Sequence, residues 1–162
     1  MKIEEIKKSH KKNLFDCGIK ELNLYLSKTA RQHHEKGISK TFVLIDELIQ
    51  NEIIAYFTLL VCEVKPASSV KTFKNYPHLL PVLKLARFAV DLNFQKKGYA
   101  KLLIANVIHK AILISQQVGI IGITIDAKNE DVALVYRKYG FISLGDELTL
   151  FMPISVCLQL KI

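Results

Sequence analysis

The chain has 162 residues, half of them hydrophobic, and a formal net charge of +8. A chain of this length fits one domain, 1–162, which buries roughly two-thirds of its unfolded surface and is not disordered as a whole. No Cys-x-x-Cys motif is present, the N-terminus is too polar for a signal peptide, and the apolar run 53–62 is about half of a membrane span. We therefore expect a soluble cytoplasmic protein with reduced cysteines and no membrane association.

The positive charge is concentrated in two segments. Residues 1–40 carry ten Lys or Arg against five Asp or Glu, and residues 71–101 carry seven against one. A lysine-rich face in contact with solvent would explain these segments. A surface that binds a polyanion such as nucleic acid, or a phosphorylated cofactor, would explain them as well.

The first half of the chain predicts a helix, a β-hairpin and a loop. Apolar residues recur at helical spacing in segment 18–37, which ends at Gly37, a residue suited to a helix C-terminus. Segments 40–47 and 51–64 are rich in β-branched and aromatic residues and flank the polar segment 48–51, which predicts two antiparallel strands. Residues 64–81 contain three of the four prolines, so we expect a long surface loop there.

The second half predicts alternating strands and helices. Segment 82–91 is a nearly continuous apolar run, typical of a strand covered on both faces, and the pattern from 98 to about 116 is that of an amphipathic helix. Segment 119–127 predicts another strand, 129–140 a short helix between the N-cap Asn129 and Gly140, and 141–154 two closing strands. Strand–helix–strand order implies a parallel pair with a right-handed crossover. We therefore expect an α/β fold, a mixed central β-sheet with helices on both faces.

A glycine opens the helix that follows the strand 82–91. At this position Gly98 would let backbone N–H groups approach an anion, and the helix dipole adds a partial positive charge. The Walker A pattern and the dinucleotide-binding fingerprint are both absent. These residues alone fit a phosphate site that includes Lys96, Lys97 and Lys101, and they also fit an exposed turn without a function.

The surroundings of this loop resemble the GNAT acetyltransferases. Gln95, Gly98 and Ala100 correspond to the family's Q/R-x-x-G-x-G/A loop, and an aromatic pair, Tyr136 and Tyr139, precedes Gly-Phe in the later helix. Two further segments, 15–44 and 80–91, resemble the F-x-C-G…G-x-S-K/R-T-F/Y-V and P-V-x-x-L-G/A-R-L/F-A-V-D signatures of the GNAT toxins of toxin–antitoxin modules. The resemblance covers about residues 14–153 and implies the GNAT fold. One departure is Asp126, which stands where the family frequently has a histidine.

The resemblance implies acetyl-CoA as the co-substrate, with its pyrophosphate on the glycine loop and its pantetheine along the preceding strand. Tyr136 matches the tyrosine that protonates the CoA thiolate, although a tyrosine that only packs on the sheet would look the same in the sequence. We identify no convincing general base, with Glu63 or a water relay as options, and we expect no metal. The implied cofactor-binding residues are Phe88, Ala89, Val90, Gln95, Lys96, Lys97, Gly98, Tyr99, Ala100, Lys101 and Asn129.

The toxins that this chain resembles acetylate the amino acid on charged tRNA, which inhibits translation, and a ribbon-helix-helix antitoxin controls them. We therefore expect an N-acetyltransferase of aminoacyl-tRNA, an antitoxin of that kind as partner, and a homodimer. The alternative is a GNAT enzyme that acetylates a small amine or a protein N-terminus, and a third option is a protein that only binds nucleic acid or antitoxin. The implied tRNA-binding residues are Arg87, Lys28, Arg31, Lys36 and Lys40.

Overall fold

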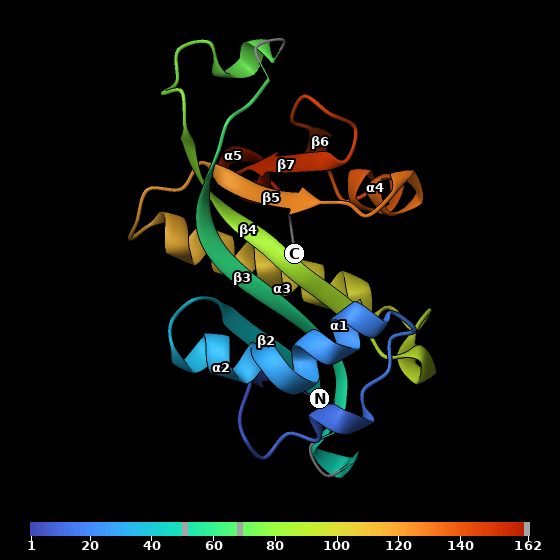
Figure 1. Ribbon diagram of the computed structural model, residues 1–162. Helices are drawn as coiled ribbons and strands as arrows, with labels where there is room; N and C mark the ends of the chain where they lie inside the picture. Colours follow the sequence, from blue (N-terminus) through green and yellow to red (C-terminus); the bar gives the residue numbers. More distant parts are fainter. Residues whose placement is uncertain (50–51, 68–69, 161–162) are drawn as a thin grey trace. The chain divides into compact units, whose positions relative to one another are not determined.

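A computed structural model describes residues 1–49, 52–67 and 70–160 (Figure 1). Within these residues, seven strands form one sheet in the order β1-β2-β3-β4-β5-β7-β6. The chain divides into two compact units: unit 1 is Met1–Leu60 with Ala86–Asn106, and unit 2 is Val61–Leu85 with Val107–Ile162. The mixed sheet with its helices confirms the expected α/β class, while a single domain over 1–162 stays a prediction.

Unit 1 begins with antiparallel strands. β1 (Lys2–Glu5) pairs with β2 (Lys40–Ile45), and β2 pairs with β3 (Ile53–Val64), which confirms the predicted hairpin. The predicted hairpin turn includes residues 50–51, which lie outside the described residues. Thr41 and Thr58 face each other in this register, and their buried hydroxyl oxygens are 2.9 Å apart. This hydrogen bond satisfies two polar groups in an otherwise apolar layer.

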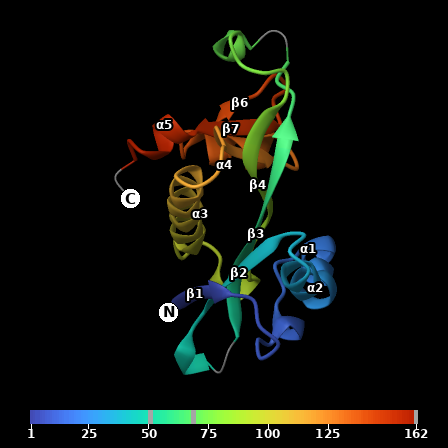
Figure 2. The ribbon, with the colours of Figure 1, turned by 90° about the vertical axis from the view of Figure 1, so that its left-hand side faces the viewer.

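The predicted N-terminal helix is present but interrupted. It consists of α1 (Lys20–Leu24), a π-helical turn (Tyr25–Thr29) and α2 (Ala30–Glu35), and it ends just before Gly37, whose φ is +72°. Figure 2 shows α1 and α2 on one side of β2 and β3. The hydroxyl of the fully buried Tyr56 on β3 donates a hydrogen bond of 2.9 Å to the carbonyl of Leu22, which fastens the helix to the sheet.

Two buried histidines hold β1 in place. The Nδ1 atom of His10 accepts the backbone N–H of Lys7 at 2.9 Å, and the Nδ1 atom of His34 accepts that of Thr41 at 3.1 Å. In each ring the Nε2 atom lies close to a carboxylate, Glu4 for His10 at 3.0 Å and Glu5 for His34 at 3.2 Å. Since Nδ1 accepts, the neutral ring carries its proton on Nε2 and donates it to the carboxylate.

Unit 2 contains the parallel pair that the sequence predicts. β4 (Leu80–Val90) pairs with β5 (Gly122–Asp126) at Leu83↔Ile123 and Lys84↔Thr124, and β5 pairs antiparallel with β7 (Thr149–Pro153). The two-residue strand β6 (Ile142–Ser143) then pairs with β7, as expected for the closing strands. A Cβ atom on Gly122 would lie 2.3 Å from the carbonyl oxygen of Met152, so only glycine fits at this position of β5.

Two of the remaining helices, α3 (Tyr99–Ser115) and α4 (Glu130–Arg137), lie where they are expected. α3 runs from unit 1 into unit 2 and buries Leu103, Val107 and Ala111 on one face. Unit 2 also contains α4, as predicted. It further contains the short helix α5 (Ile154–Cys157), which the sequence does not predict. The loop between β3 and β4 contains one 3-10 turn, Lys71–Phe73, and residues 68–69 of the predicted loop lie outside the described residues.

The β1 carboxylate of Glu4 generates a prediction about pH. Hydrogen bonds from Lys7, at 2.7 Å, and from Lys2 hold the pKa of Glu4 at about 2 instead of the ordinary 4.5. A lowered folded-state pKa stabilises the fold above about pH 4.5, and this contribution is lost as the pH falls toward 2. Chemical denaturation between pH 7 and 2 should show that Glu4→Gln removes on the order of 2 kcal/mol at neutral pH and almost nothing near pH 2.

Lys7→Met serves as the matched control, because it removes the largest cause of the lowered pKa. In this background, the stability difference made by Glu4→Gln should be smaller at neutral pH and should vanish at a higher pH than in the wild type. A stability difference that stays constant from pH 7 to 2 would contradict the prediction.

Candidate functional site

The loop between β4 and α3 has the backbone geometry that the sequence predicts. Lys96 and Gly98 adopt φ values of +60° and +86°, and α3 begins at the next residue, Tyr99. A Cβ atom on Gly98 would meet nothing within 4 Å, so open space lies beside this backbone. The first turn of a helix has N–H groups without intrahelical acceptors, and its dipole is positive at this end. The junction can therefore receive an anion.

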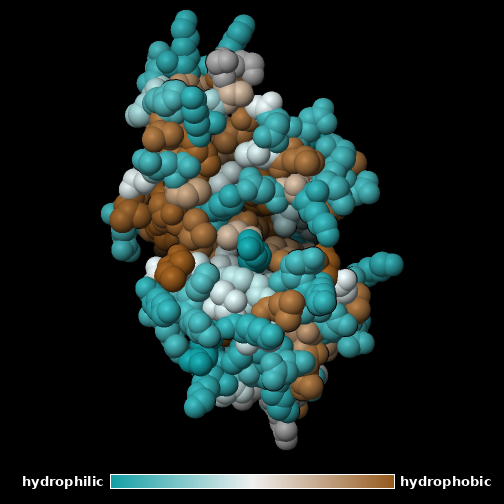
Figure 3. Space-filling view, viewed as in Figure 1, coloured by the Kyte–Doolittle hydropathy of each residue, from teal (hydrophilic) through white to brown (hydrophobic). Residues whose placement is uncertain are grey.

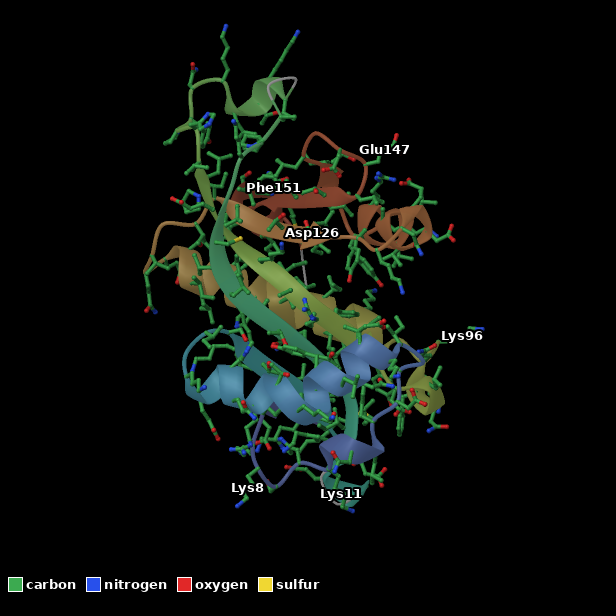
Figure 4. The ribbon with its side chains drawn as sticks, viewed as in Figure 1. Lys8, Lys11, Lys96, Asp126, Glu147 and Phe151 are labelled. Atoms are coloured by element: carbon green, nitrogen blue, oxygen red, sulfur yellow. The ribbon has the colours of Figure 1, made fainter. Side chains whose placement is uncertain are left out.

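The side chains of this loop differ in whether they contact the rest of the protein. The Nε2 atom of Gln95 donates to the carbonyl of Val90 at 3.0 Å and to that of Cys17 at 3.4 Å, so this side chain holds the loop rather than a ligand. The Lys97 ammonium lies 5.2 Å from the ring centroid of Phe94. In Figure 4 the side chain of Lys96 extends away from the ribbon. Lys96 therefore has the most freedom to meet a ligand.

The F-D-C-G segment of the N-terminal signature supports this loop. The carboxylate of Asp91, which is 5% exposed, accepts the backbone N–H groups of Asp16 and Asn93, both at 2.9 Å. In return, the backbone N–H of Leu92 donates to the carbonyl of Asp16 at 2.8 Å. The segment thus docks on the end of β4, immediately before the loop. Sequence reasoning missed Asp91, because an aspartate after a strand also fits an ordinary turn.

Cys17 belongs to the same turn and is not a nucleophile. Its thiol is buried and lies 3.1 Å from the side-chain oxygen of Asn23, to which it donates a hydrogen bond. Burial raises the pKa of the thiol, which keeps it protonated. Cys17 is therefore a small buried residue of this turn.

The backbone of Phe88, Ala89 and Val90 forms the end of β4 in unit 1. Ala89 is buried in the core, whereas Phe88 and Val90 are partly exposed. The coverage of both faces that the apolar run predicts therefore holds for Val82 and Leu83, which are consecutive and buried, but not for this end of the strand. A partly exposed strand end has backbone groups near solvent. Its role toward a ligand stays a prediction.

In unit 2, Asn129 and Tyr136 mark the two ends of α4. The side-chain oxygen of Asn129 accepts the N–H of Val132 at 3.0 Å, which confirms the N-cap. Tyr136 is 8% exposed, and its ring meets the Phe141 ring edge-on at 5.8 Å. Burial, with a smaller contribution from Tyr139, raises the pKa of Tyr136 well above its ordinary 10.0. The phenol is therefore protonated at neutral pH and can donate a proton.

The predicted tRNA-binding residues all lie in unit 1 and differ in how they are held. The guanidinium of the exposed Arg87 lies 5.1 Å from the ring centroid of Tyr25. Arg31 forms an ion pair with Glu35, and Lys40 donates to the carbonyl of His34 at 3.3 Å. Lys28 is exposed on the π-helical turn, and Lys36 is exposed just after α2. Figure 3 shows mainly hydrophilic side chains over these helices.

Two further charged features escaped the sequence reasoning. In unit 1, a pocket of about 410 Å³ beside the F-D-C-G turn is lined by residues that include Lys12 and Lys20. Burial and the nearby Arg31 lower the pKa of Lys12. In unit 2, Asp126 at the end of β5 pairs with Lys84 at 2.5 Å. The residues are charged in the sequence, but their partners lie far along the chain, so no local pattern indicates the pairing.

Among residues 1–49, 52–67 and 70–160, no three His, Cys, Asp or Glu side chains are grouped so that they could hold a metal ion. Within the same part of the chain, no helix has both the length and the apolar character required to cross a membrane.

The sequence profile of the acetyltransferase (GNAT) domain matches residues 25–149, which is well over half of the chain. The protein therefore belongs to the GNAT acetyltransferase family, and its sheet and helices form the GNAT fold. A curated relative, the tRNA-acetylating toxin of Mycobacterium tuberculosis (strain ATCC 25618 / H37Rv), is 27% identical over 140 residues, which cover 85% of this chain and 82% of that protein.

Solved structures of similar sequence cover nearly the whole chain. A tyrosine-to-phenylalanine mutant of KacT has a TM-score of 0.91 and 29% identity over 98% of this chain and 97% of its own. AtaT complexed with acetyl-methionyl-tRNAfMet has a TM-score of 0.90 and 27% identity, with the same coverage of 98% and 97%. A tyrosine-to-phenylalanine mutant of AtaT, bound to the C-terminus of the antitoxin AtaR and to acetyl-CoA, has a TM-score of 0.84 and 26% identity over 98% and 96%.

The buried carboxylate of Asp91 leads to a stability prediction. Asp91→Ala leaves the N–H groups of Asp16 and Asn93 without their acceptor and should lower the free energy of unfolding by about 3 kcal/mol. Asp46→Ala is the control, since the Asp46 carboxylate accepts the N–H of Leu48 in a more exposed turn and should cost less than about 1 kcal/mol. Urea denaturation measures both, and equal losses for the two variants would show that Asp91 has no special role.

Proposed function

We propose that this protein transfers the acetyl group of acetyl-CoA to the α-amine of aminoacyl-tRNA and so inhibits translation as the toxin of a toxin–antitoxin pair. The observation that carries the proposal is the similarity of 98% of the chain to AtaT complexed with acetyl-methionyl-tRNAfMet. Membership of the acetyltransferase family and the similarity to a tRNA-acetylating toxin support it independently.

The glycine loop is the proposed binding site for the pyrophosphate of acetyl-CoA. Its fit to that group rests on the positive φ of Gly98, the open space beside it and the N-terminus of the 17-residue helix α3. The backbone N–H groups from Gln95 to Ala100 would bind the phosphate oxygens, while Lys96, Lys97 and Lys101 would neutralise charge. The backbone of residues 88–90 would bind the pantetheine amides, and Asn129 lies at the cap of α4 as a further candidate contact.

Tyr136 is the proposed general acid. Acetyl-CoA supplies an activated acyl thioester. As the α-amine forms an amide bond to the acetyl carbon and the carbon–sulfur bond breaks, the Tyr136 hydroxyl would give its proton to the leaving thiolate. Its buried, protonated phenol suits this role. The proton that the amine loses would pass to water, directly or through Glu63, which is exposed near the end of β3, and the Tyr136 phenolate would regain a proton from water.

The partners follow from the same similarities. Two of the similar structures contain a tRNA or the C-terminus of an antitoxin, which supports aminoacyl-tRNA and an antitoxin as partners of this chain as well. We extend the proposal to an antitoxin of the ribbon-helix-helix type, to a homodimer and to the cytoplasm, where aminoacyl-tRNA is found. Arg87, Lys28, Arg31, Lys36 and Lys40 would contact the tRNA, with the exposed Lys28 and Lys36 as the least constrained of them.

Three glycine variants test the loop. Gly98→Ala and Gly37→Ala both force a side chain into positive φ in open space, so each should lower the free energy of unfolding by about 1–2 kcal/mol. Gly119→Ala has open space without positive φ and should be neutral. In calorimetric titrations with acetyl-CoA, Gly98→Ala alone should weaken binding, by about tenfold, because the added Cβ occupies the space that the phosphate needs. Equal acetyl-CoA affinity in Gly98→Ala and Gly37→Ala would disprove the assignment of the loop.

Transfer of labelled acetyl groups tests the reaction itself. The protein is given labelled acetyl-CoA with aminoacyl-tRNA, deacylated tRNA or polyamines, and we expect label on aminoacyl-tRNA alone. Tyr136→Phe should bind acetyl-CoA normally and transfer about 100-fold more slowly. Tyr139→Phe, a partly exposed tyrosine just after the same helix, is the control and should transfer at nearly the wild-type rate.

Each remaining outcome favours a different function. Label on polyamines instead of RNA would replace the proposal with a small-amine acetyltransferase, and absence of transfer to every acceptor would favour a protein that only binds. A wild-type rate in Tyr136→Phe would exclude Tyr136 as the general acid without excluding the reaction.

A further inference from the structure

Three aromatic rings in unit 2, those of Phe151, Phe73 and Tyr76, contact one another in sequence and form a ladder from the core to the surface. The Phe151 ring on β7 meets the Phe73 ring edge-on at 5.4 Å, and Phe73 meets Tyr76 edge-on at 5.5 Å. Phe73 also packs against the buried cluster of Val82 and Phe151, so the ladder has a rigid base. Tyr76 is 52% exposed at its outer end. The partly buried Phe73 ring holds the half-exposed Tyr76 ring in place, so Tyr76 offers its surface to a partner at little cost in conformational entropy.

Two lysines lie on the same loop as this ring. The backbone hydrogen bonds Lys74 N–H to Lys71 carbonyl, at 3.2 Å, and Tyr76 N–H to Phe73 carbonyl, at 3.0 Å, fold residues 71–76 into consecutive turns. Lys71 and Lys74 are exposed, and long nitrogen-tipped side chains project from this loop in Figure 4. The sequence contains no Asp or Glu from 64 to 90, so the loop presents positive charge only.

A cavity of about 570 Å³ lies within this loop. The residues that line it include Lys71, Phe73, Lys74, Tyr76, Pro77 and His78. Its wall therefore combines aromatic and proline surfaces with cationic groups. A purely apolar ligand would leave Lys71 and Lys74 without a counter-charge. An acidic side chain of a peptide would pair with the lysines but would not stack on the Tyr76 ring. An unpaired nucleotide has both a flat base that stacks on an aromatic ring and a phosphate that pairs with lysine.

We infer that this loop, residues 70–80 together with Pro66 and Ala67, binds unpaired nucleotides of the RNA substrate, with a base stacked on Tyr76 and phosphates against Lys71 and Lys74. The inference rests on the proposed function, because an aminoacyl group is carried on a single-stranded RNA end. A double helix would not expose its base faces to Tyr76. The loop therefore selects the single-stranded part of the substrate.

Fluorescence anisotropy with a labelled single-stranded RNA oligonucleotide and with a duplex of the same sequence tests the inference. Tyr76→Ala should weaken binding of the single strand by about tenfold, while Tyr76→Phe keeps the ring and should bind like the wild type. The affinity for the duplex should be the same in all three proteins. Unchanged single-strand affinity in Tyr76→Ala would overturn the inference.

A pair of double variants tests the phosphate contacts. Lys71→Gln with Lys74→Gln should flatten the dependence of log affinity on log salt by about 1.4. Lys8→Gln with Lys11→Gln removes two exposed charges at the same spacing in unit 1 and serves as the control (Figure 4). The control should leave the slope nearly unchanged. Equal slopes for the two double variants would contradict a specific role for the loop, even if a Tyr76 variant failed to fold.

Acetyl transfer separates this inference from the proposed function. If both hold, Tyr76→Ala raises the KM for aminoacyl-tRNA and leaves acetyl-CoA binding unchanged. If transfer occurs with an unchanged KM, the loop inference fails and the function stands. If no acceptor is acetylated but single-strand affinity depends on Tyr76, the function fails and the inference stands. Weaker binding of an acidic antitoxin peptide with unchanged RNA affinity would assign the loop to a protein partner instead and overturn the inference.

Discussion

The carboxylate of Asp91 joins parts of unit 1 that are distant in the sequence. It accepts the backbone N–H of Asp16 from the N-terminal signature and that of Asn93 from the turn before the glycine loop. A buried carboxylate requires such partners, because its desolvation is otherwise expensive. Gln95 completes the connection by donating to the carbonyls of Val90 and Cys17. The signature at residues 15–18 is therefore a structural support for the loop, and the proposed binding of acetyl-CoA depends on it indirectly.

The features that local chemistry determines could be predicted from the sequence. Gly37, Gly98 and Gly140 adopt positive φ at the helix boundaries where their lack of a Cβ atom indicated them, and Asn129 caps α4. The period of the apolar residues predicted α3, and the β-branched and aromatic residues of segments 40–47 and 51–64 predicted the hairpin. β1 could not be predicted, because Ile3 is its only apolar residue and its formation depends on pairing with β2, about 40 residues away.

The candidate site could be predicted only in part, because its polar contacts are not local. The sequence placed Gly98 directly before α3 and Tyr136 on the later helix, and the structure has both there, while their roles toward a ligand stay predictions. It did not indicate that Gln95 supports the loop or that Arg87 stacks on Tyr25. Nor did it indicate that Phe73 and Tyr76 extend a ladder from Phe151, because residues 73 and 151 meet only after the sheet has formed. From the sequence alone, a lysine-rich loop beside stacked aromatic rings cannot be distinguished from one that is only exposed to solvent.

Neither edge of the sheet is suited to pairing with a strand of another chain. At one edge, β1 carries Lys2, Glu4 and Glu5 among its four residues, and at the other edge β6 has only two residues. Short or charged edge strands are poor templates for the backbone of another chain. These edges thereby disfavour aggregation of the protein through pairing of strands from different copies.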